Sequence, residues 1–138
     1  MAVMHLGHVA IRRLDLEEML SFFAKLGIPE AFRMPGRDGT GVGIVYLRVD
    51  DTSFIELLPG GQPAPERPRS AAGFDHLCLL VDEIQQSYRE AVAAGLTTTG
   101  EPRMGGDGNW QFWITGPEGL RVEMMQIMPD SRQAAASR

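Results

Sequence analysis

An internal repeat constrains the fold of this 138-residue chain more than any other feature of its sequence. Residues 6–28 (LGHVAIRRLDLEEMLSFFAKLGI) align with residues 74–96 (FDHLCLLVDEIQQSYREAVAAGL) at an offset of 68, with histidine on histidine and Gly27 on Gly95. Self-similarity at this scale usually means that one supersecondary unit was copied and that the copies pack together. We therefore expect two similar modules that share one core.

Four candidate metal ligands follow the same period. His8 and His76 are 68 residues apart, and Glu56 and Glu123 are 67 residues apart, so each module has one histidine followed by one glutamate. Two imidazoles and two carboxylates suit a borderline divalent cation. Any one of these residues alone has an ordinary alternative, as a core imidazole or as a solvated or arginine-paired carboxylate. Their matching places in two repeats favour one shared metal site.

The composition is that of an ordinary globular domain. With 43% hydrophobic and 22% charged residues, the chain can bury one sizeable core. The net charge of −5 argues against nucleic acid as a partner, because phosphate binding needs a basic surface. No apolar run has the length of a membrane span or the pattern of a secretory signal, so we expect no membrane partner and a cytoplasmic location. The one cysteine, Cys78, excludes an intrachain disulfide, and we interpret it as a buried structural thiol.

Prolines and glycines divide the chain where the repeat divides it. Residues 59–72 (PGGQPAPERPRSAA) hold four prolines and two glycines, which disfavour both a helix and a central strand. The sequence therefore predicts a single domain over 1–128, with module one at 4–58, this linker, and module two at 73–128. The polar, small residues of 129–138 predict a disordered tail.

Each module is predicted to begin with a strand and a helix. Asp15 and Asp82 are expected to cap the two helices, with Glu18 and Gln85 three residues on as in a capping box. Glycine ends each helical pattern. Three extended stretches follow each helix: 30–35, 42–49 and 53–58, then 97–103, 110–115 and 120–127. Each module thus has the order βαβββ, in the α+β class.

These features together resemble a known family. The paired βαβββ modules, the two His and two Glu residues, and the stretch GGDGNWQFWITGPEGLRVEMMQ at 105–126 resemble the vicinal oxygen chelate superfamily. Within it, the chain is most similar to the short bacterial glyoxalase I, or lactoylglutathione lyase, group. The resemblance covers about residues 4–128. It implies an eight-stranded cupped mixed sheet around one metal ion, closed within one chain or across a homodimer.

The resemblance also implies a reaction. A glyoxalase I-like lyase or isomerase converts the hemithioacetal of a 2-oxoaldehyde, such as a glutathione adduct, to a thioester through a metal-chelated enediolate. The family pattern makes His8, Glu56, His76 and Glu123 the ligands of one divalent ion, and makes Glu56 and Glu123 the groups that move the proton. The chemistry takes no electrons from the ion, so Ni, Co, Mn or Zn is expected rather than Fe.

Substrate recognition follows the family less closely. Arg12 lies four residues after His8, on the same strand face, where glyoxalase I has an arginine for a glutathione carboxylate. Arg103 falls near a basic family position in the Gly-rich segment, and both arginines are candidate substrate ligands. Arg12 could equally be a solvated charge at a strand end. Gly60 and Phe23 replace residues common in the bacterial enzymes, so another 2-oxo or coenzyme A substrate fits the metal ligands as well.

Three other classes within the superfamily stay open. Epimerases of the methylmalonyl-CoA type use the same proton transfer, commonly with Gln at the place of Glu56. Extradiol dioxygenases hold Fe(II) with two His and one Glu, which leaves Glu56 as a surplus ligand. Bleomycin-resistance-like members bind a drug without catalysis, and Trp110, Phe112 and Trp113 could stack on such a flat ligand or belong to the core.

Overall fold

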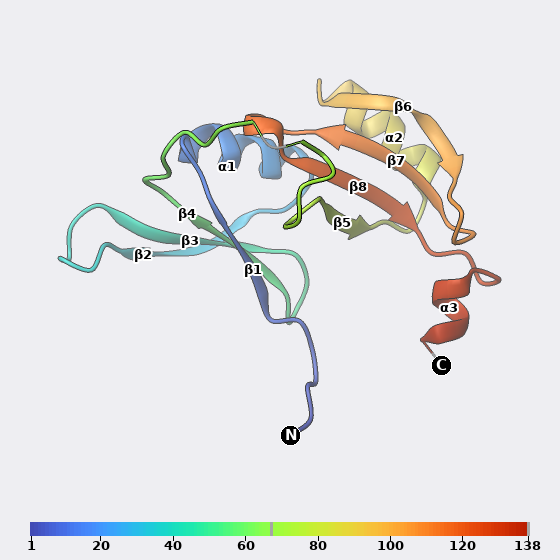
Figure 1. Cartoon of the computed structure of the whole chain (residues 1–138), viewed down its shortest axis with the longest axis horizontal. Coiled ribbons are helices and arrows are strands. Elements are labelled where there is room, and N and C mark those ends of the chain that lie inside the picture. Colours follow the sequence, from blue (N-terminus) through green and yellow to red (C-terminus); the bar gives the residue numbers. More distant parts are fainter. Residues whose placement is uncertain (67, 138) are drawn as a thin grey trace. The chain divides into compact units, whose positions relative to one another are not determined.

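The computed structural model describes residues 1–66 and 68–137, and the chain divides after residue 66 into two compact units (Figure 1). The division falls inside the predicted linker, of which Arg67 lies outside the described residues. Each unit contains a four-stranded mixed sheet with the element order βαβββ, which confirms the predicted fold class. In the described residues, no helix has both the length and the apolar character needed to cross a bilayer.

The first unit forms its sheet in the order β1-β4-β3-β2, with β1 parallel to β4 and the other neighbours antiparallel. Its elements are β1 His8–Arg12, α1 Leu16–Lys25, β2 Glu30–Pro35, β3 Val42–Arg48 and β4 Phe54–Leu58. Successive strand residues point to opposite faces, so Ile55 and Leu57 enter the core while Glu56 faces the other side. Tyr46 is the residue of β3 opposite Glu56 and shares that side.

Helix α1 begins and ends where the sequence predicts. The Asp15 carboxylate accepts a hydrogen bond from the Glu18 backbone N–H at 3.0 Å, which satisfies one of the free donors of the first turn. Gly27, just beyond the helix, has a φ of 75°, a conformation that favours glycine. Met19 and Phe23 of the apolar stripe are fully buried.

The second unit repeats the topology with the order β5-β8-β7-β6. Its elements are β5 Leu77–Leu80, α2 Ile84–Ala93, β6 Thr97–Met104, β7 Trp110–Thr115, the short turn η1 Pro117–Gly119, and β8 Arg121–Gln126. Helix α2 lies against β6, β7 and β8. The Tyr88 ring meets Phe112 edge-on at 5.4 Å on this side of the sheet. Trp113 and Glu123, which are opposite one another in β7 and β8, face the other side.

The cap of α2 differs from the prediction. Glu83, not Asp82, is the N-cap, with an extended backbone at φ −140° and ψ 105°. Its carboxylate accepts hydrogen bonds from the backbone N–H groups of Gln85 at 3.2 Å and Gln86 at 2.9 Å. A glutamate is an uncommon N-cap, so the capping rule favours the aspartate one residue earlier. The longer side chain reaches both N–H groups here, which moves the helix start by one residue.

The C-terminal segment also differs from the predicted disordered tail of 129–138. Residues Arg132–Ala136 form a short helix, α3, and the hydroxyl of Ser131 caps it by accepting a hydrogen bond from the Ala134 N–H at 3.1 Å. Ser131 is buried, and the Arg132 N–H donates to the Asp107 carbonyl at 3.0 Å. The composition of residues 129–138 alone does not predict these contacts, because their partner is a turn far away in the sequence. Arg138 lies outside the described residues.

Asn109 joins the turn between β6 and β7 to the chain that follows β8. The residue is fully buried. Its amide nitrogen donates to the Asp107 carboxylate at 2.8 Å, and its amide oxygen accepts from the Met128 N–H at 2.9 Å. A buried amide in this position has most of its hydrogen-bonding capacity satisfied, so its loss would leave buried partners unpaired.

We expect Asn109→Ala to lower the free energy of unfolding by about 1–3 kcal/mol, because the Met128 N–H loses its acceptor in a buried setting. Urea denaturation followed by circular dichroism measures this change. The matched control is Asp38→Ala in the turn between β2 and β3, where the exposed carboxylate accepts from the Thr40 N–H. The control should change stability by less than ~0.5 kcal/mol. Equal effects of the two substitutions would contradict the role assigned to Asn109.

Candidate active site

In the first unit, His8 and Glu56 lie next to one another on the sheet. The His8 Nε2 is 3.5 Å from a Glu56 carboxylate oxygen. His8 begins the edge strand β1 and is exposed, whereas Glu56 in β4 is only 6% exposed. Because β1 and β4 are parallel, with His8 opposite Phe54 and Ala10 opposite Glu56, the two side chains share one face. A carboxylate this buried is costly unless it is paired or metal-bound.

The second unit repeats the arrangement with His76 and Glu123. The His76 Nε2 is 3.3 Å from a Glu123 carboxylate oxygen, and both side chains are partly exposed. Glu123 in β8 is opposite Cys78 in the parallel strand β5, and His76 immediately precedes β5. Each unit therefore pairs its own histidine with its own glutamate, by Nε2 in both cases.

An aromatic residue accompanies each pair, and the sequence interpretation named Trp113 but missed Tyr46. Tyr46 is opposite Glu56 and Trp113 is opposite Glu123, at the same offset of 67 residues that separates the glutamates. A hydrogen bond between the Tyr46 hydroxyl and the Glu56 carboxylate raises the pKa of Tyr46. The Trp113 ring meets the His76 imidazole edge-on at 4.8 Å. The repeat itself was the signal for these two positions, although it joins two different aromatic residues.

The three aromatic residues of β7 divide between the two faces of the sheet. Phe112 is buried in the core beside Tyr88, as expected for an ordinary packing residue. Trp113 is only partly buried and lies on the side of Glu123. Trp110, an even number of positions from Phe112, belongs to the core side by strand alternation. Of the two alternatives given for these aromatic residues, Phe112 therefore packs in the core, whereas Trp113 lies on the face of Glu123.

A second carboxylate orients His76. The Asp75 carboxylate lies 2.7 Å from the His76 Nδ1 and also accepts a hydrogen bond from Arg121 Nη1 at 2.8 Å. The bond to His76, with the positive charge of Arg121, lowers the pKa of Asp75, so this carboxylate stays ionised. Such a partner holds the proton on Nδ1 and leaves the Nε2 lone pair free for a metal, as in many metal-binding histidines. At the corresponding place in the first unit, His8 follows Gly7.

Cys78 is exposed, so the interpretation of a buried structural thiol is wrong. Its position on an edge strand, on the face of Glu123, explains the difference. Loss of hydration at the sulfur and the adjacent Glu123 carboxylate raise the pKa of Cys78 to about 12. The thiol is therefore protonated at neutral pH and is a poor metal ligand in that form.

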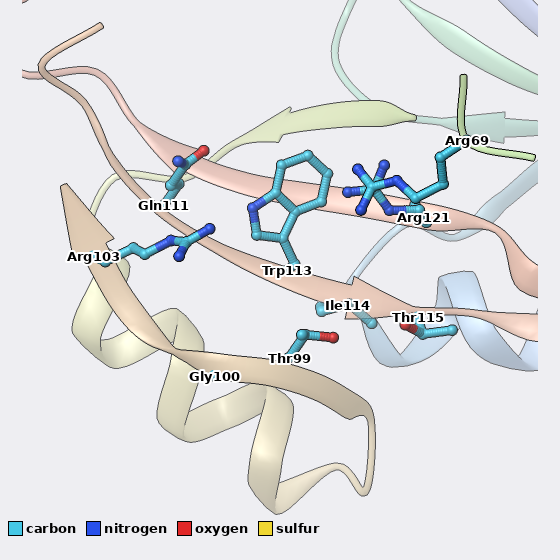
Figure 2. A pocket seen from close by; sticks show the side chains of 9 residues that line it. All are labelled: Arg69, Thr99, Gly100, Arg103, Gln111, Trp113, Ile114, Thr115 and Arg121. Carbon is cyan, nitrogen blue, oxygen red and sulfur yellow. The ribbon is translucent and has the colours of Figure 1, made fainter. Parts of the chain in front are cut away.

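The two predicted substrate ligands lie on the same sheet faces as the pairs. Arg12 is two positions beyond Ala10 on the His8 side of β1, and its Nη1 donates to the Pro59 carbonyl at 3.1 Å. Arg103 of β6 is opposite Gln111 and points into a cavity beside Trp113 (Figure 2). Arg12 is thus tied to the segment that follows β4, whereas Arg103 lines open space.

The donor groups of the two pairs fit a divalent metal ion. Each pair offers an imidazole nitrogen beside a carboxylate, and in the second unit the Asp75 carboxylate orients the imidazole through its Nδ1. Among residues 1–66 and 68–137, no three or more His, Cys, Asp or Glu side chains form a ready metal-binding group. Each unit by itself therefore supplies two ligands.

Comparison with known proteins identifies proteins that are similar to this chain in sequence or in fold. Human mitochondrial methylmalonyl-CoA epimerase is 29% identical over 92 residues, which are 62% of this chain and 51% of the epimerase, so the match spans about half of that relative. A solved glyoxalase family protein from Enterococcus faecalis has a TM-score of 0.72 at 22% identity, covering 88% of this chain and 96% of the other.

A second solved structure agrees with the first. The glyoxalase family protein from Bacillus cereus has a TM-score of 0.68 at 20% identity, covering 91% of this chain and 95% of its own. At these identities the two structures support the fold alone.

The family model described as Glyoxalase/Bleomycin resistance protein/Dioxygenase superfamily matches residues 5–124, which is most of the chain. The chain therefore belongs to the glyoxalase/bleomycin resistance/dioxygenase superfamily, as its two βαβββ units and paired His and Glu residues led us to expect.

Proposed function

We propose that this protein is a divalent-metal-dependent lyase or isomerase that moves a proton between adjacent atoms of a 2-oxo substrate, as glyoxalase I does. The observation that carries the proposal is the same pairing in both units, with Nε2 to carboxylate distances of 3.5 Å and 3.3 Å. His8, Glu56, His76 and Glu123 are the proposed ligands of one Ni, Co, Mn or Zn ion. One chain, or two chains of a homodimer, supplies all four.

The proton transfer is assigned to the two glutamates. A bound divalent ion would act as a Lewis acid for the neighbouring oxygens of the substrate. A Glu56 or Glu123 carboxylate oxygen takes the proton from the carbon beside the carbonyl and returns it to the adjacent carbon. The hydrogen bond from Tyr46 holds Glu56 in place, and Asp75 holds His76, while Glu123 has only the weak thiol donor of Cys78.

Substrate binding is assigned to arginines on the same faces. Arg12 and Arg103 are the proposed contacts for an anionic part of the substrate, through charge-assisted hydrogen bonds. Gly60 and Phe23 take the places of a common polar contact and a common Tyr in the glutathione-dependent enzymes, so the thiol carrier need not be glutathione. We keep a small-molecule substrate and a cytoplasmic homodimer as predictions.

An epimerase is the second candidate. The human relative is named a methylmalonyl-CoA epimerase, and abstraction of a proton next to a carbonyl is a step that both reactions share. The chain differs from the family pattern of such epimerases in having Glu56 where Gln is common. In an epimerase the proton returns to the same carbon from the other side, whereas in a glyoxalase reaction it moves to the neighbouring carbon.

One set of measurements tests both candidates. The protein, purified without chelator, is analysed for metal and then assayed with methylglyoxal plus glutathione, and separately with methylmalonyl-CoA in deuterated water. Thioester formation supports the first candidate, and deuterium exchange at carbon 2 of methylmalonyl-CoA supports the second. Bound iron with cleavage of a catechol ring, or saturable binding of bleomycin without turnover of either substrate, would overturn the proposal.

Replacing His76 by Ala should remove most of the bound metal, taking the ratio of ion to chain from about one toward zero. The reason is the loss of one of four protein ligands. Elemental analysis of the folded variant measures the ratio, with circular dichroism to verify the fold. His5, an exposed histidine outside the pairs, gives the control variant His5→Ala, which should keep its metal. Full metal occupancy in the His76 variant would exclude this ligand assignment.

The Asp75→Asn variant should bind the ion about 10- to 100-fold more weakly, because His76 loses the carboxylate that fixes its Nδ1 proton. Competition with a metal-binding dye measures the affinity. Asp82→Asn is the control, since Asp82 is exposed and does not cap α2. If both variants bind the ion as the unmodified protein does, Asp75 has no part in metal binding.

Changing Glu56 or Glu123 to Gln should lower kcat by about two to four orders of magnitude on a confirmed substrate, because glutamine keeps the size but cannot take the proton. Steady-state kinetics at saturating metal provide the measurement. Exposed Glu101 on β6 offers the control Glu101→Gln, expected to be neutral. A dioxygenase would instead tolerate Glu56→Gln and lose activity only with Glu123→Gln. Unchanged turnover in both glutamate variants would refute the proton transfer.

A further inference from the structure

A cavity of about 580 Å³ opens on the sheet of the second unit, on the side that carries Trp113 and Glu123 (Figure 2). Strands β6, β7 and β8 and the segment before β5 form its walls. The residues that matter for its chemistry are Arg69, Thr99, Arg103, Gln111, Trp113 and Arg121. Three of these are arginines, and none of the described residues that line the cavity is acidic.

All three arginines of the cavity have unused hydrogen-bonding capacity. Arg121 donates to Asp75, and its guanidinium lies over the Trp113 ring, 4.4 Å from the centroid. Within the described part of the chain, the Arg103 side chain makes no ion pair, and the positive charge of Arg69 contributes to the lowered pKa of Asp75 without a direct salt bridge to it. A chain with a net charge of −5 thus gathers three positive charges around one hollow. Such a concentration attracts anions.

Strand β6 has a β-bulge between Thr99 and Arg103, two residues that line this cavity. Thr99 is opposite Trp113 and Arg103 is opposite Gln111, so four steps along β6 face two steps along β7. Gly100, inside the bulge, has a φ of 73° and itself lines the cavity. The extra residues are an even number, which returns Arg103 to the same face as Thr99. The bulge therefore leaves Arg103 on the cavity side of the sheet.

The cationic surface is a property of the second unit and not of the repeat. Arg121 corresponds to Phe54 at the offset of 67, and Trp113 corresponds to Tyr46. In the first unit, Tyr46 instead stacks on Phe32 at 4.3 Å and meets Phe54 edge-on at 6.1 Å. The equivalent surface is therefore aromatic in one unit and cationic in the other. Copying alone would have given similar surfaces, so the arginines are an addition that needs its own explanation.

We propose that this cavity is an anion subsite, in which Arg69, Arg103 and Arg121 bind a carboxylate or phosphate group that the substrate carries away from its reacting carbonyl. The guanidinium fork matches both groups with paired hydrogen bonds. Trp113 lines the cavity and also contacts His76, so the subsite adjoins the second His and Glu pair. This inference rests on the proposed function for the place of the reacting end, and it makes the substrate an organic anion.

Binding of simple anions tests the subsite without any need for turnover. Inorganic phosphate and succinate are titrated separately into the full-length protein by calorimetry. We expect saturable binding of at least one of them, and the stronger of the two identifies the group that the cavity takes. Arg103→Ala should weaken that binding about tenfold or more, the usual loss for a charge-assisted hydrogen bond. The Arg103→Lys variant keeps the positive charge but not the forked guanidinium, so its anion affinity should lie between those of the unmodified protein and Arg103→Ala.

The control is Arg37→Ala, an exposed arginine in the turn between β2 and β3, which should bind both anions as the unmodified protein does. Equal affinity of the Arg103→Ala and unmodified proteins for both anions, or no saturable binding of either, would overturn the subsite.

The His76→Ala variant separates the subsite from the proposed function. It loses the proposed metal ligand but none of the arginines, so anion binding should persist there, which excludes binding through the ion. If the unmodified protein binds the anion but neither binds a metal ion nor turns over either candidate substrate, the proposed function is refuted while the subsite stands. Loss of anion binding in His76→Ala together with its metal would refute the subsite. With a confirmed substrate, Arg103→Ala should raise KM more than it lowers kcat.

Discussion

A carboxylate within the sheet is the constraint on which the rest of each unit depends. Glu56 is 6% exposed in a strand with neighbours on both sides, and an isolated charge there would be strongly destabilising. The parallel partner strand brings His8 to 3.5 Å, and the antiparallel partner brings the Tyr46 hydroxyl. A shift of one residue in either register would move Glu56 or its partner to the opposite face. The pair thus requires the mixed sheet, and the same logic applies to His76 and Glu123.

The sequence predicted the features that depend on local pattern or on the repeat. The capping by Asp15, the strand boundaries and the same βαβββ order in both units follow from alternation and period. Features that depend on side-chain length or distant contacts were not predictable. Glu83 replaces the expected cap because its chain is longer, Ser131 is ordered by a turn far along the chain, and Cys78 is exposed because its strand is an edge.

The two pairs have diverged in what restrains them, although the repeat places them alike. Asp75 fixes the imidazole of His76, whereas the residue before His8 is a glycine. Both aromatic rings meet the histidine of their pair edge-on, at 6.4 Å for Tyr46 and 4.8 Å for Trp113, but only Tyr46 has a hydroxyl that bonds to its glutamate. Sequence identity between the two repeats does not reveal these different contacts, because they are made by residues that differ between the repeats. Glu56 accepts from a hydroxyl and Glu123 from the Cys78 thiol, a weaker donor, so the two carboxylates are restrained unequally, as a proton transfer needs if one moves while the other stays.

Arg121 connects the proposed anion subsite to the His76 and Glu123 pair in the second unit. Its guanidinium donates a hydrogen bond to Asp75, and Asp75 in turn bonds to His76. These two hydrogen bonds link the cavity to the His76 and Glu123 pair. An anion that took the whole guanidinium would release Asp75 and weaken the orientation of the imidazole. A guanidinium has five N–H donors, however, and only one donates to Asp75 here. The remaining donors can serve an anion in the cavity while the stacking on Trp113 keeps the plane of the group fixed. One residue can therefore serve the proposed anion subsite and keep Asp75 against His76 at the same time.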